Sequence, residues 1–430
     1  MKDLDQKTLS VRYLKGAFLT FFTDMFDIYA PLVFLAPAME YFLPKSMSPT
    51  KLIFYYTLIF GATLVGRPLG AIIFGFLTDT LGRRRITLIV ISGFTVIMFL
   101  LMLLPGYDVG GDTVIIAFII LRFLVGVFLG GGYTSANPMA IENAPSDKRG
   151  LYGGIIASGM AIALLTSSIL TLILLSIMSK SNYIAYGWRF GFLLGMLIGI
   201  LSFVYLEKRV PESILWENSK KEEKTKSGFR GLLHGENLKS LLNVLILSTG
   251  MFLGVVSAYG TVSVVYTKIL HLSSALTTTI TLIAYAVMFG TTIFGSWLSD
   301  KIGRRFALVL YGFLIFSIAP LLYYLIVVGL YKNTLLLLLF TTIIFTLAQF
   351  PVPVNIVYIN ERFPTSHRGL GYGIGYSLPV IIAGFYSYYQ KVLSNFMPFK
   401  FTQIAILSFA GLLWFIGGLI GKETKGKDLN

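Results

Sequence analysis

The chain has 430 residues, of which 55% are hydrophobic and only 13% carry a charged side chain. This composition, with a mean hydropathy of +0.77, excludes a soluble domain with a polar surface and places the chain in a lipid bilayer. The formal net charge of +15 could suit nucleic acid, but the basic residues alternate between successive loops, which argues against that partner. The absence of cysteine excludes disulfides and thiolate metal sites.

The apolar residues fall into about twelve stretches of the roughly 20 residues that a membrane-spanning helix needs. If the N-terminus is cytoplasmic, about 25 of the 35 Lys and Arg residues lie on the cytoplasmic side, as the positive-inside rule requires. The first apolar run shows no cleavage site, so it is a retained span. We therefore expect a multi-pass protein of a prokaryotic cell membrane with both termini in the cytoplasm.

The first span, at about residues 16–42, carries Asp24 and Asp27 on one helix face. At 1.5 Å per residue, Asp27 lies roughly 18 Å from the entry point, near the middle of the bilayer. Arg122 reaches a similar depth on the fourth span, so we expect it to pair with Asp27. A structural ion pair is the alternative, but a carboxylate at this depth usually has a function. Tyr133 and Asn137, later on the same span, are candidate solute contacts.

The second half of the chain carries neutral polar and aromatic groups within its spans. Pro351 and Pro353 predict a break in the tenth span, and helix breaks are tolerated where they line a cavity. Each group singly is more often a packing residue. Together they predict a solute-binding surface made of Tyr259, Tyr285, Gln349, Asn355 and Tyr376.

Two motifs each occur twice, about 220 residues apart. The first motif places Asp, Gly, Arg and Arg at Asp79, Gly82, Arg83 and Arg84, and again at Asp300, Gly303, Arg304 and Arg305. The second motif joins a Glu to an Arg seven residues later, at Glu142 with Arg149 and at Glu361 with Arg368. The repeat predicts two homologous six-helix bundles, at residues 1–206 and 241–430, joined by a solvated, mixed-charge linker at 207–240.

The three histidines, His234, His271 and His367, fall in loops or at span ends. No metal-binding set and no Ser-His-Asp or Cys-His set can be placed at one depth, so we expect neither an enzyme nor a bound cofactor.

The repeated turns, the E-x-x-P-x-x-x-R-G segments and the order of the two halves resemble the major facilitator superfamily over essentially the whole chain. Shorter motifs are similar to those of its metabolite:proton symporter, aromatic-acid symporter and sugar-porter groups, with the phosphate symporters beside them. They are the Arg67 to Gly70 segment, Gly187 to Arg189, Pro211 to Ser213, Glu423 to Lys427 and Asp24 to Asp27.

The resemblance implies twelve transmembrane helices in two rocking bundles, alternating access and a monomer. It also implies a cytoplasmic gate in which Asp79 joins Arg83 and Arg149 while Asp300 joins Arg304 and Arg368, with Glu142 and Glu361 beside them. Two departures matter. Gly132 and Tyr133 replace the acid usual in the fourth span of phosphate and metabolite symporters, and the seventh span lacks the Q-Q-x-x-G-x-N pattern of sugar porters.

The function we predict is proton-coupled symport of a small organic acid, which is a mono- or dicarboxylate or an aromatic acid. Asp27 is the expected coupling carboxylate, Arg122 its partner and Asp24 a second proton-binding or solute-facing group. A sugar or polyol carrier, or a phosphate symporter, is the alternative. The expected partners are therefore a small solute, protons and the lipid bilayer.

Overall fold

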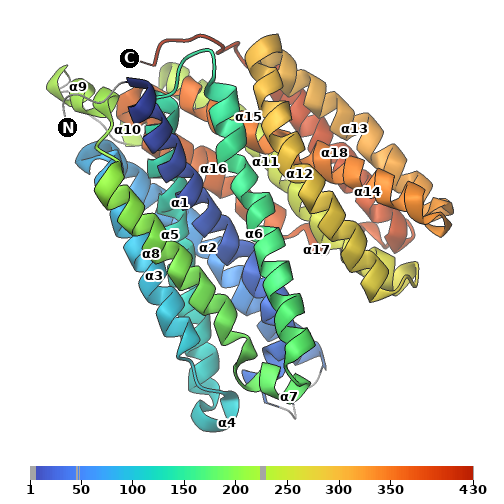
Figure 1. The fold of residues 1–430 in the computed structure, drawn as a ribbon. Helices are drawn as coiled ribbons and strands as arrows, with labels where there is room; N and C mark the ends of the chain where they lie inside the picture. The colour runs from blue at the N-terminus through green and yellow to red at the C-terminus, as the bar shows by residue number, and fades with distance from the viewer. Residues whose placement is uncertain (1–5, 45–46, 48, 223–228, 430) are drawn as a thin grey trace. The chain divides into compact units, whose positions relative to one another are not determined.

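The structure is a computed structural model that describes residues 6–44, 47, 49–222 and 229–429. Its described residues are almost entirely helical (Figure 1). Ten of the helices are long and apolar enough to cross a membrane, and the bent pair Thr365–Gly384 with Tyr386–Leu393 raises that number to eleven. Helix α1, Gln6–Phe34, which holds Asp24 and Asp27, is the remaining crossing that the sequence predicts.

The chain divides into two compact units. Unit 1 comprises residues 1–143, 162–228 and 365–373, and unit 2 comprises 144–161, 229–364 and 374–430. Each unit therefore takes a short segment from the opposite half of the sequence. Helix α6, Arg149–Ile177, and helix α16, Arg368–Gly384, each begin in one unit and continue in the other.

Unit 1 is built mainly from five long helices whose middle turns are apolar. Figure 1 shows α1, α5, α8 and α3 side by side, and α2 packs against α5. The helices are α2 (Pro49–Leu81), α3 (Arg83–Met102), α5 (Asp112–Glu142) and α8 (Arg189–Arg209), with the short helices η1 (Ala36–Tyr41), α4 (Tyr107–Gly110), α7 (Lys180–Asn182), η2 (Tyr183–Gly187), α9 (Ile214–Glu222) and η5 (Thr365–His367). Gly126 and Gly130 of α5 face α2 so closely that an added Cβ would overlap its backbone, which is the close packing expected of small residues in membrane helices.

Unit 2 contains the remaining helices, among which α18 packs against α11 and α13, and α14 against α12. They are α10 (Phe229–Leu232), α11 (Gly235–Val264), η3 (Val265–Ile269), α12 (Ser274–Ile302), α13 (Arg304–Val328), η4 (Leu330–Lys332), α14 (Thr334–Gln349), α15 (Pro351–Arg362), α17 (Tyr386–Leu393) and α18 (Phe399–Ile420). The tenth span is divided at Phe350, between α14 and α15, as Pro351 and Pro353 predict.

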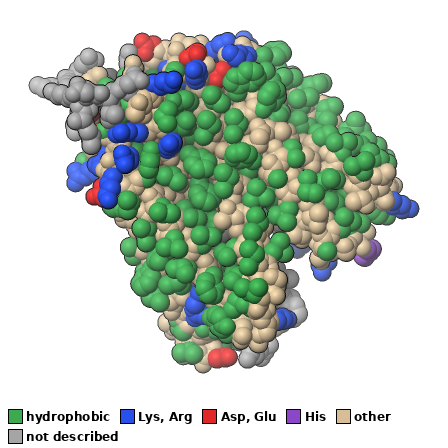
Figure 2. Space-filling view, in the orientation of Figure 1, with side chains coloured by type: hydrophobic (Ala, Val, Ile, Leu, Met, Phe, Trp, Pro, Cys, Tyr) green, Lys and Arg blue, Asp and Glu red, His purple; other side chains and the backbone are tan. Residues whose placement is uncertain are grey.

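The surface follows the membrane pattern. On the face of the molecule in Figure 2, hydrophobic side chains cover the middle of the long helices, and Lys and Arg gather near the start of α1 and near α9. Part of the predicted linker lies outside the described residues, at 223–228. The earlier part of the linker contacts α2, because the indole Nε1 of Trp216 on α9 donates a 2.9 Å hydrogen bond to the carbonyl of Asp79.

Candidate transport site

A buried ion pair joins α1 to α5 in unit 1. Arg122 Nη1 donates to Asp27 Oδ1 at 2.7 Å, and the two side chains are 1% and 0% exposed. The structure therefore contains the pair that equal depth on two spans predicts. Taking two charges out of water costs several kcal/mol per ion, and the attraction between Arg122 and Asp27 offsets part of that cost.

Arg67 on α2 adds a second buried cation, which our sequence reasoning noted only as part of a motif. The residue is 3% exposed, and its Nε and Nη2 atoms have no hydrogen-bond partner in the part of the chain that the structure describes. It interacts electrostatically with Asp24 and Asp27. The sequence signal was available, because Arg67 is an ionisable residue inside an apolar span.

Asp24 of α1 lies against Gly132 of α5. A Cβ on Gly132 would be 2.5 Å from Asp24 Oδ2 and 2.7 Å from Oδ1, so the glycine leaves the space that this carboxylate occupies. Asp24 is 2% exposed and its Oδ2 has no hydrogen-bond partner among the described residues. An unpaired carboxylate oxygen thus lies close to an incompletely paired guanidinium, a costly arrangement that a proton or an anion could relieve.

Two of the predicted solute contacts on α5 approach the segment 365–373 within unit 1. Asn137 Nδ2 donates to Tyr372 Oη at 3.1 Å, and the Tyr133 and Tyr372 rings are 6.1 Å apart. Asn137 Oδ1 has no hydrogen-bond partner in the described residues.

Unit 2 brings three of the predicted solute contacts together. Tyr259 Oη on α11 donates to Gln349 Oε1 on α14 at 3.0 Å, and its ring lies edge-on to Tyr285 with centroids 6.1 Å apart. Phe345 completes the cluster, 4.7 Å from Tyr259 and 5.5 Å from Tyr285. Gln349 Nε2 is buried without a hydrogen-bond partner in the described chain. Neutral donors beside aromatic faces are typical of small-solute pockets.

The other two candidates of unit 2 make different contacts. Asn355 Nδ2 on α15 donates to Ser248 Oγ at 2.9 Å, while its Oδ1 has no hydrogen-bond partner among the described residues. Tyr376 on α16 lies edge-on to Phe252 at 4.9 Å.

The first copy of the repeated motif forms a charge cluster in unit 1. Arg83 Nη1 donates to Asp79 Oδ1 at 2.6 Å and Arg83 Nη2 to Glu142 Oε1 at 3.1 Å. Arg368 Nη1 donates to the same Glu142 oxygen at 2.6 Å. Asp79 also accepts the backbone N–H groups of Gly369 and Leu370, both at 2.9 Å, so this carboxylate stabilises the first turn of α16.

The second copy repeats this arrangement in unit 2. Arg304 lies 2.8 Å from Asp300 and 3.3 Å from Glu361. Arg149 Nη1 lies 3.7 Å from Glu361 Oε1. Asp300 accepts the N–H groups that begin α6, from Gly150 and Leu151, both at 2.8 Å.

These contacts correct the expected grouping. Arg149 belongs to the cluster of Arg304 and Arg368 to that of Arg83, the reverse of what the resemblance implied. The physical reason lies in the helix starts. Arg149 is the first residue of α6, and Asp300 binds the first amides of that helix. Arg368 is the first residue of α16, and Asp79 binds the first amides of that helix.

Glu212 and Glu423 complete the two turns, and our sequence reasoning did not assign them a role. Glu212 accepts the N–H groups of Arg83 and Arg84, and Glu423 those of Arg304 and Arg305. Both turns pass through a glycine with positive φ, Gly82 at 112° and Gly303 at 93°, a conformation that other residues rarely adopt. Partial burial disfavours the charge of Glu423, but backbone N–H groups outweigh it and hold the pKa of this carboxyl below its usual range.

Within the described residues, no group of three or more His, Asp or Glu side chains is placed to hold a metal ion. Long apolar helices, a membrane-depth ion pair and a twofold internal repeat define a multi-pass membrane transporter. The model of the Major Facilitator Superfamily matches residues 17–386. The chain belongs to this family of secondary transporters and is not an enzyme.

Curated relatives carry different solutes. The chain is 24% identical over 422 residues to the shikimate transporter of Escherichia coli (95% of this chain, 94% of the relative). It is 26% identical to the proline/betaine transporter of the same species (86% and 75%) and 25% identical to the citrate-proton symporter of Klebsiella pneumoniae (91% and 87%). The proton:xylose symporter XylE, solved with 6-bromo-6-deoxy-D-glucose, matches with a TM-score of 0.82 at 18% identity, over 99% of this chain and 98% of that chain, which confirms the fold.

Proposed function

We propose that the chain is a proton-coupled symporter for a small organic acid. The observation that carries this proposal is the buried ion pair of Asp27 and Arg122, 2.7 Å apart. A carboxylate can change protonation in a low-dielectric site, whereas a guanidinium cannot. When Asp27 is charged it holds Arg122; when it is protonated the guanidinium is released and can face an anion, and the equilibrium between the two access states shifts.

We propose Arg67 as the group that receives the carboxylate of the solute. Its two incompletely paired nitrogens suit a carboxylate, which guanidinium binds in a fork geometry. Shikimate, citrate, proline and betaine, the solutes named for the relatives, all carry a carboxylate. Asp24 beside Arg67 is then the second proton-binding group, because an approaching anion favours its neutral form.

In the same proposal the two charge clusters are the gate on the cytoplasmic side. Arg368 belongs to the cluster of Arg83, and Arg149 belongs to the cluster of Arg304. The distribution of Lys and Arg supports a cytoplasmic position for both termini, and the working unit that we propose is a monomer in the cell membrane.

A sugar or polyol carrier is the second candidate. The observation that favours it is the cluster of Tyr259, Tyr285 and Gln349, whose neutral hydrogen-bonding groups and ring faces suit a polyhydroxy solute.

The test is proton movement in proteoliposomes challenged with shikimate, citrate, proline, betaine, xylose or phosphate. The matched variants are Asp27→Asn and Asp108→Asn, the second being an exposed aspartate on α4. Proton uptake with a carboxylate solute, lost in Asp27→Asn and kept in Asp108→Asn, supports the proposal. A response to xylose alone selects the second candidate, and solute flux without proton movement refutes the coupling.

A further inference from the structure

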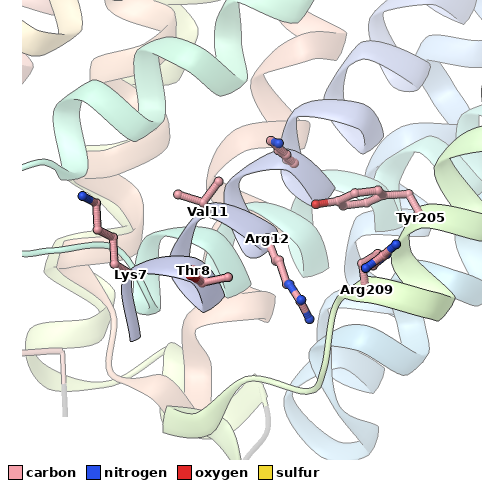
Figure 3. Close-up of a pocket in the computed structure, with 7 residues that line it drawn as sticks. Lys7, Thr8, Val11, Arg12, Tyr205 and Arg209 are labelled. Carbon is pink, nitrogen blue, oxygen red and sulfur yellow. The ribbon is translucent and has the colours of Figure 1, made fainter. Parts of the chain in front are cut away.

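A cavity of about 720 Å³ opens between the first turns of α1 and the last turns of α8 in unit 1. Figure 3 shows its lining residues, which are Lys7, Thr8, Val11, Arg12 and Lys15 from α1 with Tyr205 and Arg209 from α8. On α1 the residues Lys7, Val11 and Lys15 are four apart, as are Thr8 and Arg12, so they share one helix face. Tyr205 and Arg209 are likewise four apart on α8. The cavity is thus a groove between two facing helix surfaces.

The groove concentrates positive charge, and its lining residues include no acid. Four of the seven are Lys or Arg. Arg12, Lys15 and Arg209 form no ion pair with any carboxylate in the residues that the structure describes. Arg84 nearby differs, because its side chain donates to the carbonyls of Val210 and Glu207. An anion bound between these cations would offset their mutual repulsion.

An apolar path leads away from the cations along the same helices. On α8, Leu201 and Leu197 continue the four-residue stripe of Tyr205 and are 67% and 45% exposed. On α1, Phe18 and Phe22 follow Lys15 and stack with their ring centroids 6.3 Å apart. The cationic groove therefore lies beside an exposed apolar stripe of α8 that continues along the span.

We propose that this groove binds an anionic phospholipid. The phosphodiester lies among Arg12, Lys15 and Arg209, and an acyl chain follows Leu201 and Leu197. Basic pockets between membrane helices at the interface recognise such headgroups, and Tyr205 has the amphipathic side chain typical of this depth. A free phosphate would use only the cations, whereas a lipid uses both the cations and the apolar stripe.

The test is native mass spectrometry of the full chain in detergent, titrated with phosphatidylglycerol or with phosphatidylcholine of the same acyl chains. The variant Arg12→Gln/Lys15→Gln/Arg209→Gln removes the cations of the groove. The control Lys268→Gln/Lys332→Gln/Lys391→Gln removes the same charge from exposed positions of unit 2. Since each basic residue near a membrane surface contributes about fivefold, phosphatidylglycerol affinity should fall at least tenfold in the groove variant and stay within about twofold in the control. Phosphatidylcholine binding should not change.

A second variant separates a lipid from a soluble anion. Leu201→Gln should weaken phosphatidylglycerol about threefold by removing apolar contact, and millimolar glycerol 3-phosphate should not displace the lipid from the wild-type chain. Three results would overturn the proposal: equal binding of the two lipids, an equal loss in the control variant, or displacement by glycerol 3-phosphate. The three single-cation variants are measured in parallel. If the triple variant does not fold, unchanged affinity in all three single variants would also overturn the proposal.

Discussion

Replacing Glu142 with Gln should destabilise the chain more than the matched replacement of Glu361 with Gln in the second charge cluster. Glu142 Oε1 accepts from Arg83 at 3.1 Å and Arg368 at 2.6 Å, and Oε2 accepts from Ser213 Oγ at 2.5 Å. The amide would keep the volume of the side chain but leave two buried guanidinium groups sharing the Asp79 carboxylate. Removing one partner of a buried pair costs about 3–5 kcal/mol. Because an amide can retain some of the hydrogen bonds, we expect a cost at the low end of this range, about 3 kcal/mol.

The matched change is Glu361→Gln in unit 2. Glu361 lies 3.3 Å from Arg304 and 3.7 Å from Arg149, so weaker contacts are lost and the expected cost is about half as large. Thermal unfolding of both variants in one detergent, followed by tryptophan fluorescence, gives the comparison. If Glu361→Gln lowers the midpoint as much as Glu142→Gln does, contact length does not set the cost and the reasoning is refuted.

Three further predictions rest on other residues. Arg67→Lys should raise the KM for a carboxylate solute at least about tenfold in uptake assays, because lysine keeps the charge and loses the fork; an unchanged KM would remove Arg67 from the site. Gly132→Ala should cost about 1–3 kcal/mol by overpacking against Asp24, and melting curves should show most of that loss recovered in Asp24→Ala/Gly132→Ala. Glu423→Gln should lower the unfolding midpoint at pH 7. Because the folded chain holds the Glu423 pKa below its usual value, the wild-type advantage should shrink as the pH falls below about 4.5; a difference independent of pH would exclude the charge as its source.

The sequence predicted the helices, the repeat and the Asp27–Arg122 pair because each depends on a one-dimensional quantity. The length of each apolar stretch identifies a span, and the offset between the repeated motifs identifies the two halves. The helical rise per residue gives the depth of a side chain in the membrane. Two charges at one depth in an apolar medium have few other partners, so their pairing follows from the chain alone.

The contacts that the sequence did not predict depend on how loops fold back onto helix ends. Glu212 and Glu423 lie outside the spans, and their role appears only when Gly82 and Gly303 take positive φ and turn the first amides of α3 and α13 toward them. The proximity of Asp24 to Gly132 depends on the rotation of α1 against α5, and motif spacing does not determine such a rotation.

The two charge clusters also show which contacts hold residues 365–373 in unit 1 and residues 144–161 in unit 2. Each cluster holds two acids and two bases, and in each the second base comes from the other half of the sequence, Arg368 in unit 1 and Arg149 in unit 2. Withdrawing residues 365–373 from unit 1 would leave Glu142 with one guanidinium and expose the first amides of α16 that Asp79 now binds. Buried charges are tolerated only when they are balanced and hydrogen-bonded. Any motion that moves residues 365–373 away from unit 1, or residues 144–161 away from unit 2, must therefore rebalance the charges of the cluster in that unit, and we expect a bound proton or solute that shifts this charge balance to change the free energy of the motion.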